Sequence, residues 1–228
     1  MCTVDGVMML NGGIGDREYF KIYSPREWQF YRYILSQVVL FSEPGPILDV
    51  GAGLGFIVEG ALRWGLECTG LEGSREAVEL ARKRYPSVVM EQHLLSEPFP
   101  LENDRYQTVI MNQVVEHLEP AVARNALAEA FRVMRPGGLL IVYSPSRFNK
   151  EQQKDDKTHI NMLSPSELRD VVSSSGFVDI TACDVPLDLL GKGWFGKGLM
   201  YTIFTVARWE RLSATANCRA YKPTIAAT

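Results

Sequence analysis

The chain has 228 residues, 46% of them hydrophobic and 22% charged, and its formal net charge at pH 7 is −3. This length and composition suit one globular domain that buries a sizeable core without disulfide or metal support. The acidic balance excludes the broad positive field with which nucleic-acid-binding proteins hold phosphates. We therefore expect a partner other than nucleic acid.

Cysteines, histidines and apolar runs narrow the class of protein further. The four cysteines form no CxxC pair, and the chain has three histidines. We therefore expect free thiols, no metal site and a reducing compartment. Residues 1–10 lack the pattern of a signal peptide, and the apolar stretch 199–207 is about half as long as a membrane helix needs to be. The sequence thus predicts a cytoplasmic protein without a membrane span.

The first predicted element is a helix that begins at Ser24. Ser24-Pro25-Arg26-Glu27 has the pattern of a capping box with proline at the first helical position. Helical spacing gives this helix an apolar face that consists of Trp28, Tyr31, Ile34 and Val38. The chain then breaks at Pro44-Gly45-Pro46, so residues 1–44 are predicted to form an N-terminal helical cap.

Short apolar runs alternate with helical patterns beyond residue 45. The runs predicted as strands are 47–50, 68–71, 88–90, 107–111, 139–143 and 177–183. The predicted helices are 55–64, 74–84, 120–134 and a last one that a second capping box opens at Ser164 and Gly176 closes. Residues 199–207 are ambiguous, but their Thr, Ile and Val content favours a strand. Such alternation indicates a mostly parallel sheet with helices on both faces.

A glycine-rich turn joins the first of these strands to the next helix. Its spacing, GxGxG in residues 51–55, differs from the GxGxxG of dinucleotide-binding proteins, and no P-loop lysine follows it. Asp49 would repel a pyrophosphate but is suited to an ammonium group. Glu72 ends the next strand, about where such folds place the acid that binds a ribose. We infer that the turn binds a nucleoside that carries an amine.

These motifs resemble the class I S-adenosylmethionine-dependent methyltransferases, especially the bacterial small-molecule group that includes the ubiquinone-biosynthesis O-methyltransferases. The resemblance covers about residues 19–183. It rests on the glycine turn with Gly70-Leu71-Glu72-Gly73-Ser74, on Val115-Glu116-His117-Leu118, on Arg135-Pro136-Gly137-Gly138, and on residues 159–176. Glycine turn and Glu-His-Leu together are specific, whereas Pro-Gly-Gly alone is not.

The resemblance implies a Rossmann-like three-layer αβα sandwich with a seven-stranded, mostly parallel sheet whose last strand is antiparallel. Residues 199–207 would supply that last strand. A single methyltransferase domain, 1–228, would then consist of the cap, a cofactor-binding core at 45–185, and a C-terminal strand and tail at 186–228.

The resemblance also implies S-adenosylmethionine as the cofactor and S-adenosylhomocysteine as the product. The residues that would line the methionine half of the cofactor are Asp49, Gly51, Ala52, Gly53 and Gly55. Glu72, beside Gly73, would hold the ribose hydroxyls. Asn112 and Gln113 would lie beneath the sulfonium.

The adenine end departs from the family pattern. The family usually has an aspartate after the third strand that accepts a hydrogen bond from the adenine amino group, whereas this chain has Glu91-Gln92-His93-Leu94. Gln92 or His93 would take that role, because an amide oxygen and a neutral imidazole can both accept. Tyr106-Gln107, where Phe-Asp is usual, is interpreted as a change at the start of a strand.

Two histidines are candidates for a general base that removes a proton from an acceptor hydroxyl. His117 follows the fourth predicted strand, on the rim where open α/β sheets bind ligands. His159 lies in the long stretch after the fifth strand, where lids and substrate walls form. The alternative for each is a packing role, and Glu116 would orient a neighbour.

Aromatic residues near both ends of the chain have two interpretations. Tyr19 and Tyr23 either pack in the core or close over the cofactor. The apolar residues at 194–204 either pack in the core or contact a lipophilic acceptor.

The sequence thus predicts methyl transfer from S-adenosylmethionine to an oxygen of a small molecule. A non-catalytic protein that binds the cofactor or its product, and a protein methyltransferase, are the alternatives. The oligomeric state is left open, with a homodimer among the options.

Overall fold

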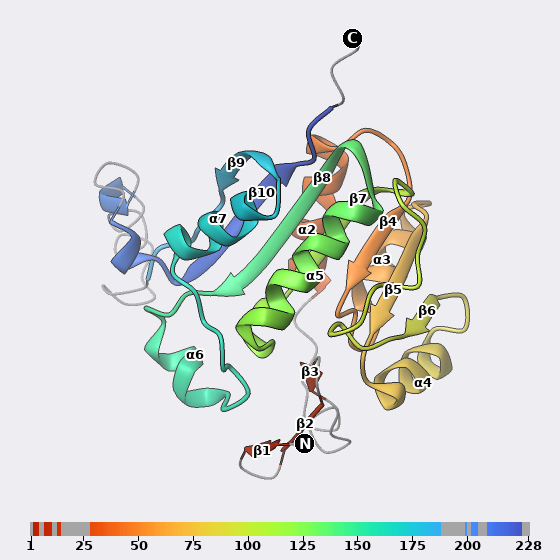
Figure 1. Ribbon diagram of the computed structural model, residues 1–228, viewed down its shortest axis with the longest axis horizontal. Helices are drawn as coiled ribbons and strands as arrows, with labels where there is room; N and C mark the ends of the chain where they lie inside the picture. The colour runs from red at the N-terminus through yellow and green to blue at the C-terminus, as the bar shows by residue number, and fades with distance from the viewer. Residues whose placement is uncertain are drawn as a thin grey trace.

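A seven-stranded sheet forms the centre of the computed structural model, which describes residues 2–4, 7–10, 13–14, 28–187, 199, 202–204 and 209–224. The strand order is β6-β5-β4-β7-β8-β10-β9 (Figure 1). In chain order these strands are β4 Ile47–Val50, β5 Cys68–Glu72, β6 Val89–Gln92, β7 Tyr106–Asn112, β8 Met134–Pro145, β9 Val178–Ala182 and β10 Thr215–Tyr221. A separate antiparallel sheet consists of β1 Cys2–Val4, β2 Val7–Leu10 and β3 Gly13–Ile14.

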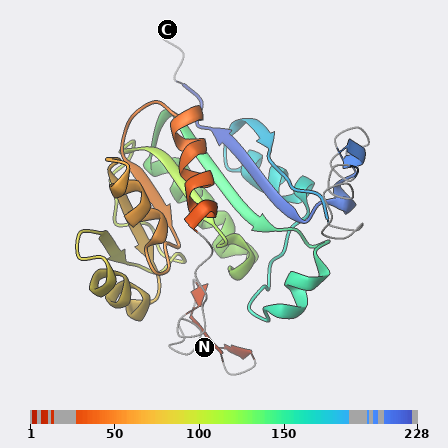
Figure 2. The same cartoon turned by 180° about the vertical axis from the view of Figure 1, so that it is seen from behind.

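Helices cover both faces of the large sheet. They are α2 Trp28–Phe41, α3 Phe56–Arg63, α4 Arg75–Arg84, α5 Pro120–Val133 and α7 Pro165–Ser174. The short helix α6 Lys150–Asp155 lies beyond the end of β8 (Figure 1) and buries no residue. Figure 1 shows α5 and α7 on one face, and Figure 2 shows α2 and α3 on the other. Short 3-10 turns lie at Val115–His117 and Glu210–Leu212. The three layers confirm the predicted αβα sandwich.

Alternating strand residues supply the two halves of the core. Leu48 and Val50 of β4 pack in the cluster that includes α5 and α7. Ile47 packs in the other cluster, with α2 and α3. Because successive side chains of a strand point to opposite faces, each buried strand serves both layers. The parallel pairing of β4 with β5 and with β7 places the carboxyl ends of these three strands at one edge of the sheet.

Most predicted elements are confirmed. Ser74 caps α4 by accepting the N–H of Ala77 at 3.2 Å, and Ser164 with Glu167 forms the predicted capping box of α7. Gly176 follows α7 at φ 95°, a left-handed conformation that glycine adopts without steric cost. The capping box predicted at Ser24 lies outside the described residues.

The prediction that an antiparallel strand completes the sheet is confirmed, but its location at residues 199–207 was wrong. Leu199 and 202–204 are helical, and the rest of 199–207 lies outside the described residues. The antiparallel strand is β10, which pairs with β8 on one side and β9 on the other. Its alternate residues Ala216, Cys218 and Ala220 are buried in the core. Strand formation depends on such packing more than on Thr, Ile and Val content.

The helix after Pro120 ends earlier than predicted. Met134 belongs to β8, where it pairs with Tyr106 of β7. The segment Pro136-Gly137-Gly138 was expected to precede this strand. It lies instead within β8, where the pairing of β8 with β7 is irregular. Gly137 has φ 76° there, and its N–H donates to the carbonyl of Lys222 at 2.9 Å.

Among the described residues, none of the helices is both long enough and apolar enough to cross a membrane.

Candidate functional site

The turn between β4 and α3 is packed on one side and open on the other. Gly51, Gly53 and Gly55 have φ of 71°, 52° and 73°, in the left-handed region that favours glycine. A Cβ added to Gly51 would collide with Val114, whereas one added to Gly53 would meet no heavy atom within 4 Å. The space above Gly53 is therefore where a ligand can approach the backbone.

Neighbouring strand β5 holds this turn from below. The N–H groups of Gly51 and Ala52 both donate to the carbonyl of Leu71, at 2.7 and 3.1 Å. Gly51, Ala52 and Gly53 are half-buried and Gly55 is buried. The turn is thus fixed in place by backbone hydrogen bonds, without help from side chains of its own.

Glu72 ties the tip of β5 to the glycine turn. Its Oε2 accepts the N–H of Gly53 at 2.8 Å, and its Oε1 accepts the N–H of Ser74 at 2.8 Å. Burial raises the pKa of Glu72, and the N–H donors of Ser74, Gly53 and Gly73 oppose that rise. A carboxylate has about four acceptor sites, so these three donors leave a site free. Glu72 can therefore accept a ligand hydroxyl while it holds the turn.

Asp49 places a second buried carboxylate at the base of the turn. Only 2% of its surface is exposed, and burial together with the charge of Glu72 raises its pKa well above the usual value. A cation in this site would relieve the repulsion between the two carboxylates, whereas an anion would increase it. The electrostatics favour a positively charged ligand over a phosphate.

The residues predicted for the adenine end lie after β6. The backbone N–H of His93 donates to the carbonyl of Glu72 at 2.8 Å, and its Nε2 lies 3.3 Å from the carbonyl of Glu97. Because that carbonyl can only accept, Nε2 carries the proton and Nδ1 is left as an acceptor. The exposed Gln92 donates through Nε2 to the carbonyl of Gly73 at 3.3 Å, and Leu94 is half-buried.

Asn112 and Gln113 form the carboxyl end of β7 and its first loop residue. The Oδ1 of Asn112 is buried with no hydrogen-bond partner among the described residues. Gln113 has φ 57°, and its N–H donates to the carbonyl of Tyr143 at 2.7 Å. A buried acceptor without a partner and a non-glycine residue in the left-handed region both occur often at ligand sites.

The two candidate bases lie side by side. The ring centroids of His117 and His159 are 4.8 Å apart. Nδ1 of His117 lies 2.9 Å from Oγ1 of Thr158, and Nδ1 of His159 lies 3.1 Å from the carbonyl of Gln152. Burial and the neighbouring His159 lower the pKa of His117 from 6.5 to about 4. His117 is thus neutral at physiological pH.

A fully buried acid adjoins this pair. Glu116 has 0% exposed surface, and its Oε2 accepts the hydroxyl of Ser144 at 3.1 Å. Asp156 lies on the other side, with its Oδ2 3.7 Å from Nε2 of His159. The sequence analysis did not single out Ser144, Asp156 or Thr158.

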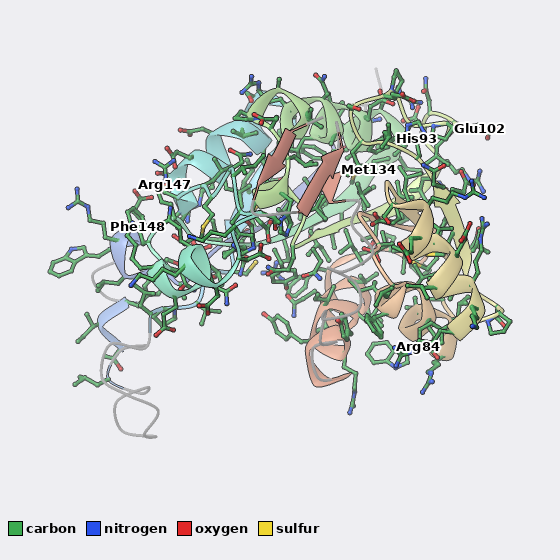
Figure 3. All side chains as sticks on the ribbon, turned by 90° about the horizontal axis from the view of Figure 1, so that it is seen from below. Arg84, His93, Glu102, Met134, Arg147 and Phe148 are labelled. Carbon is green, nitrogen blue, oxygen red and sulfur yellow. The ribbon has the colours of Figure 1, made fainter. Side chains whose placement is uncertain are left out.

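The structure therefore brings the predicted site residues together in groups along one edge of the sheet. Figure 3, seen from below, shows His93 on the opposite side of the molecule from Arg147 and Phe148, the second and third residues after β8. Tyr19, Tyr23, Trp194 and Phe195 lie outside the described residues. Leu199 is exposed.

Comparison with known proteins gives one family. Residues 48–142 match the family profile described as a methyltransferase domain. The chain is 30% identical over 134 residues, 58% of its length, to a Mycolicibacterium smegmatis protein named "Probable S-adenosylmethionine-dependent methyltransferase". It is 34% identical over 106 residues, 44% of its length, to a ubiquinone biosynthesis O-methyltransferase of Alkalilimnicola ehrlichii. It is 25% identical over 193 residues, 72% of its length, to the tRNA N(3)-methylcytidine methyltransferase Mettl2 of Drosophila melanogaster.

The matches span 51%, 42% and 58% of those three proteins, in the same order. Among solved structures, a methyltransferase from Archaeoglobus fulgidus superposes with a TM-score of 0.68 at 17% identity, covering 91% of this chain and 100% of that one. That likeness shows the fold. Residues 48–142 thus match the methyltransferase-domain family, and the chain is similar to S-adenosylmethionine-dependent methyltransferases over about half of the length of those relatives.

Proposed function

We propose that this protein transfers a methyl group from S-adenosylmethionine to an oxygen of a small molecule. The observation that carries the proposal is the bridge from Glu72 to the N–H of Gly53, which lies beside the open space above that glycine. It puts a carboxylate for ribose hydroxyls next to backbone that a ligand can reach. The similarity of residues 48–142 to the methyltransferase-domain family supports the same cofactor.

The residues present fit that cofactor. Asp49, with Gly51, Ala52, Gly53 and Gly55, would hold the methionine half, since the repelling carboxylates Asp49 and Glu72 favour a cationic group. Glu72 and Gly73 would hold the ribose. The adenine would lie against Gln92, His93 and Leu94.

Asn112 and Gln113 would face the sulfonium. The buried Oδ1 of Asn112 offers a partial negative charge to a positive group, and it has no competing partner among the residues described. When bound, S-adenosylmethionine supplies an activated methyl group. The chain's own task is then to orient an acceptor, exclude water and take up a proton.

His159 is the residue proposed to take up that proton. Its Nδ1–H donates to the carbonyl of Gln152, which leaves Nε2 as the basic nitrogen, and Asp156 lies near that nitrogen. A carboxylate beside an imidazole stabilises the protonated ring. His117, whose pKa is lowered to about 4, would be a weak base and would position its neighbour.

An acceptor screen with radiolabelled S-adenosylmethionine tests the proposal. Its arms are hydroxylated small molecules such as phenols and sugars, small amines, bulk tRNA and a protein mixture. We expect label in an alkali-stable methyl ether from the first arm. Label only in amines, RNA or protein would overturn the oxygen or small-molecule part of the proposal. No transfer in any arm, despite measurable cofactor binding, would favour a non-catalytic binding protein.

A further inference from the structure

Three potential metal ligands converge just beyond the carboxyl end of β7. Glu116, His117 and His159 each have one ligand atom within 4.8 Å of those of the other two. Glu116 and His117 belong to the 3-10 turn after β7, and His159 follows α6. The side chains of Glu116 and His159 have 0% and 5% of their surface exposed, respectively. The cluster is therefore enclosed and not a chance meeting on the surface.

Hydrogen bonds hold both imidazole rings in the orientation typical of metal-bound histidines, in which one ring nitrogen donates to an oxygen and the other presents a lone pair. The carbonyl of Gln152 can only accept, so Nδ1 of His159 carries its proton and Nε2 presents a lone pair. Nδ1 of His117 faces the carbonyl and hydroxyl oxygens of Thr158, and that hydroxyl in turn bonds to Asp156. A metal-binding histidine almost always donates its other ring N–H to a carbonyl, a carboxylate or water in this way.

The acid is oriented by a comparable contact. Oε2 of Glu116 accepts the hydroxyl of Ser144, and the carbonyl of Glu116 accepts the N–H of Asn161 at 2.9 Å. Asn161 also donates its side-chain amide to the carbonyl of Val115 at 3.1 Å. These bonds fix the 3-10 turn against the segment that carries His159. The two halves of the cluster are thus held by a shared network.

We propose that Glu116, His117 and His159 bind a divalent first-row transition-metal ion. Two imidazoles and one carboxylate are a ligand set that zinc and iron(II) sites use, and the set leaves a coordination position open. Ligand atoms about 2.0–2.2 Å from an ion stand roughly 3–4 Å from one another. Small rotations of the side chains would close the cluster to that size. The open position would take water or an oxygen of a bound molecule.

From the sequence we expected no metal site, and this proposal departs from that expectation. The cysteines and histidines lack the close spacing of a structural zinc motif, and the three ligands lie on two separate segments, the turn at Val115–His117 and the loop after α6. The inference does not depend on methyl transfer, but it is an alternative to the base role proposed for His159, because Nε2 cannot bind an ion and take up a proton at the same time.

Cobalt(II) titration of untagged, chelator-treated protein tests the proposal. We expect visible d–d absorption that saturates at one ion per chain, together with a rise in the unfolding temperature. His159→Ala should weaken cobalt binding by at least about 10-fold. Loss of a residue that merely hydrogen-bonds to a metal ligand already weakens such sites by about 10-fold or more, and this variant loses a ligand itself. Glu116→Gln should weaken cobalt binding too. His93→Gln, which changes the one remaining histidine, should leave cobalt affinity within about twofold of wild type.

Several results would overturn the proposal. One is the absence of saturable visible absorption in wild-type protein. Another is cobalt binding by a folded His159→Ala variant that equals that of wild type. A strong thiolate-to-cobalt band in the near ultraviolet would instead assign the ion to a cysteine. Because His159 lies on a loop after α6, its variant is expected to fold even where Glu116→Gln does not.

Discussion

The candidate site has two regions that are built by different means. The glycine-loop region consists of the turn at Gly51–Gly55 with Asp49 and Glu72, and the histidine region consists of Glu116, His117 and His159. In the first, backbone N–H groups meet one carboxylate 19 residues away from Gly53. In the second, side chains from distant segments meet, and Nδ1 of His117 also contacts Oγ1 of Thr158, 41 residues further along the chain. The first region is suited to hold a ligand, and the second to move a proton or bind an ion.

This difference predicts that the two regions can be broken separately. A change in the glycine-loop region should lower cofactor affinity, because the backbone there forms the binding surface. A change in the histidine region should lower turnover and leave cofactor affinity nearly intact.

His159→Ala should lower turnover by about 10²–10⁴-fold, the range typical of a lost general base. Affinity for S-adenosylmethionine should stay within about threefold of wild type, since His159 is not placed against the cofactor. Steady-state rates with the acceptor found in the screen, together with calorimetric titration, measure both quantities. Lys157→Ala, an exposed neighbour, is the control. If affinity for S-adenosylmethionine fell as much as turnover, the two regions would not act separately.

Glu72→Ala should lower affinity for S-adenosylmethionine by about 100-fold. Hydrogen bonds to a charged group contribute about 1.5–3 kcal/mol each, and the variant loses those to the ribose as well as the support of Gly53. Calorimetric titration measures the affinity, and circular dichroism shows whether the variant is folded. Glu79→Ala on the exposed surface of α4 is the matched control. Wild-type affinity in a folded Glu72→Ala protein would remove the carboxylate from the site.

Gly53→Ala should lower the same affinity by roughly 10-fold with a small loss of stability. Its Cβ would enter the open space above the turn, and a positive φ costs a non-glycine residue about 1 kcal/mol. Gly65→Ala is the matched control, because Gly65 also has a positive φ and open space but lies at the far end of α3. Equal affinity in the two variants would show that the space above Gly53 is not used.

Asp49→Asn should change the pH dependence of stability. Burial and Glu72 raise the pKa of Asp49 above its unfolded value. Such a group favours folding below the unfolded pKa and loses that contribution as pH rises through the folded pKa. The ligand-free variant should therefore be more stable than wild type at about pH 8, and the gain should shrink towards about pH 4. Urea midpoints across that range measure it, and a gain that does not vary with pH would contradict the account.

The glycine-loop region could be predicted from the sequence because its cause is local. Three glycines with positive φ and an acid at the tip of the next strand follow from spacing along the chain. Capping residues such as Ser74 and Ser164 act on N–H groups two or three residues away, so they too are readable.

The histidine region could be predicted only in part. His117 and His159 were candidates, but their contact depends on how the segment after β8 folds back, which no local pattern specifies. Asp156 and Thr158 form a local turn, with the N–H of Thr158 on Oδ1 of Asp156 at 2.8 Å, and that signal was available in the sequence. Ser144, in contrast, reaches Glu116 across 28 residues and had no signal.

The misplaced last strand has a related cause. Residues 199–207 have side chains that favour strands, whereas β10 has small and polar ones. β10 forms because it fits between β8 and β9, with backbone pairing on both sides. Tertiary pairing of this kind outweighs local propensity.

Binding of S-adenosylhomocysteine to the unmodified chain tests the central claim most directly. The nucleoside keeps the ribose and the amine that Glu72 and Asp49 are proposed to hold, and it needs no acceptor. Calorimetric titration should give one saturable site per chain, with NAD producing no saturable heat under the same conditions. Saturable binding of NAD, or no binding of either S-adenosylhomocysteine or S-adenosylmethionine, would contradict the assignment of the glycine-loop region.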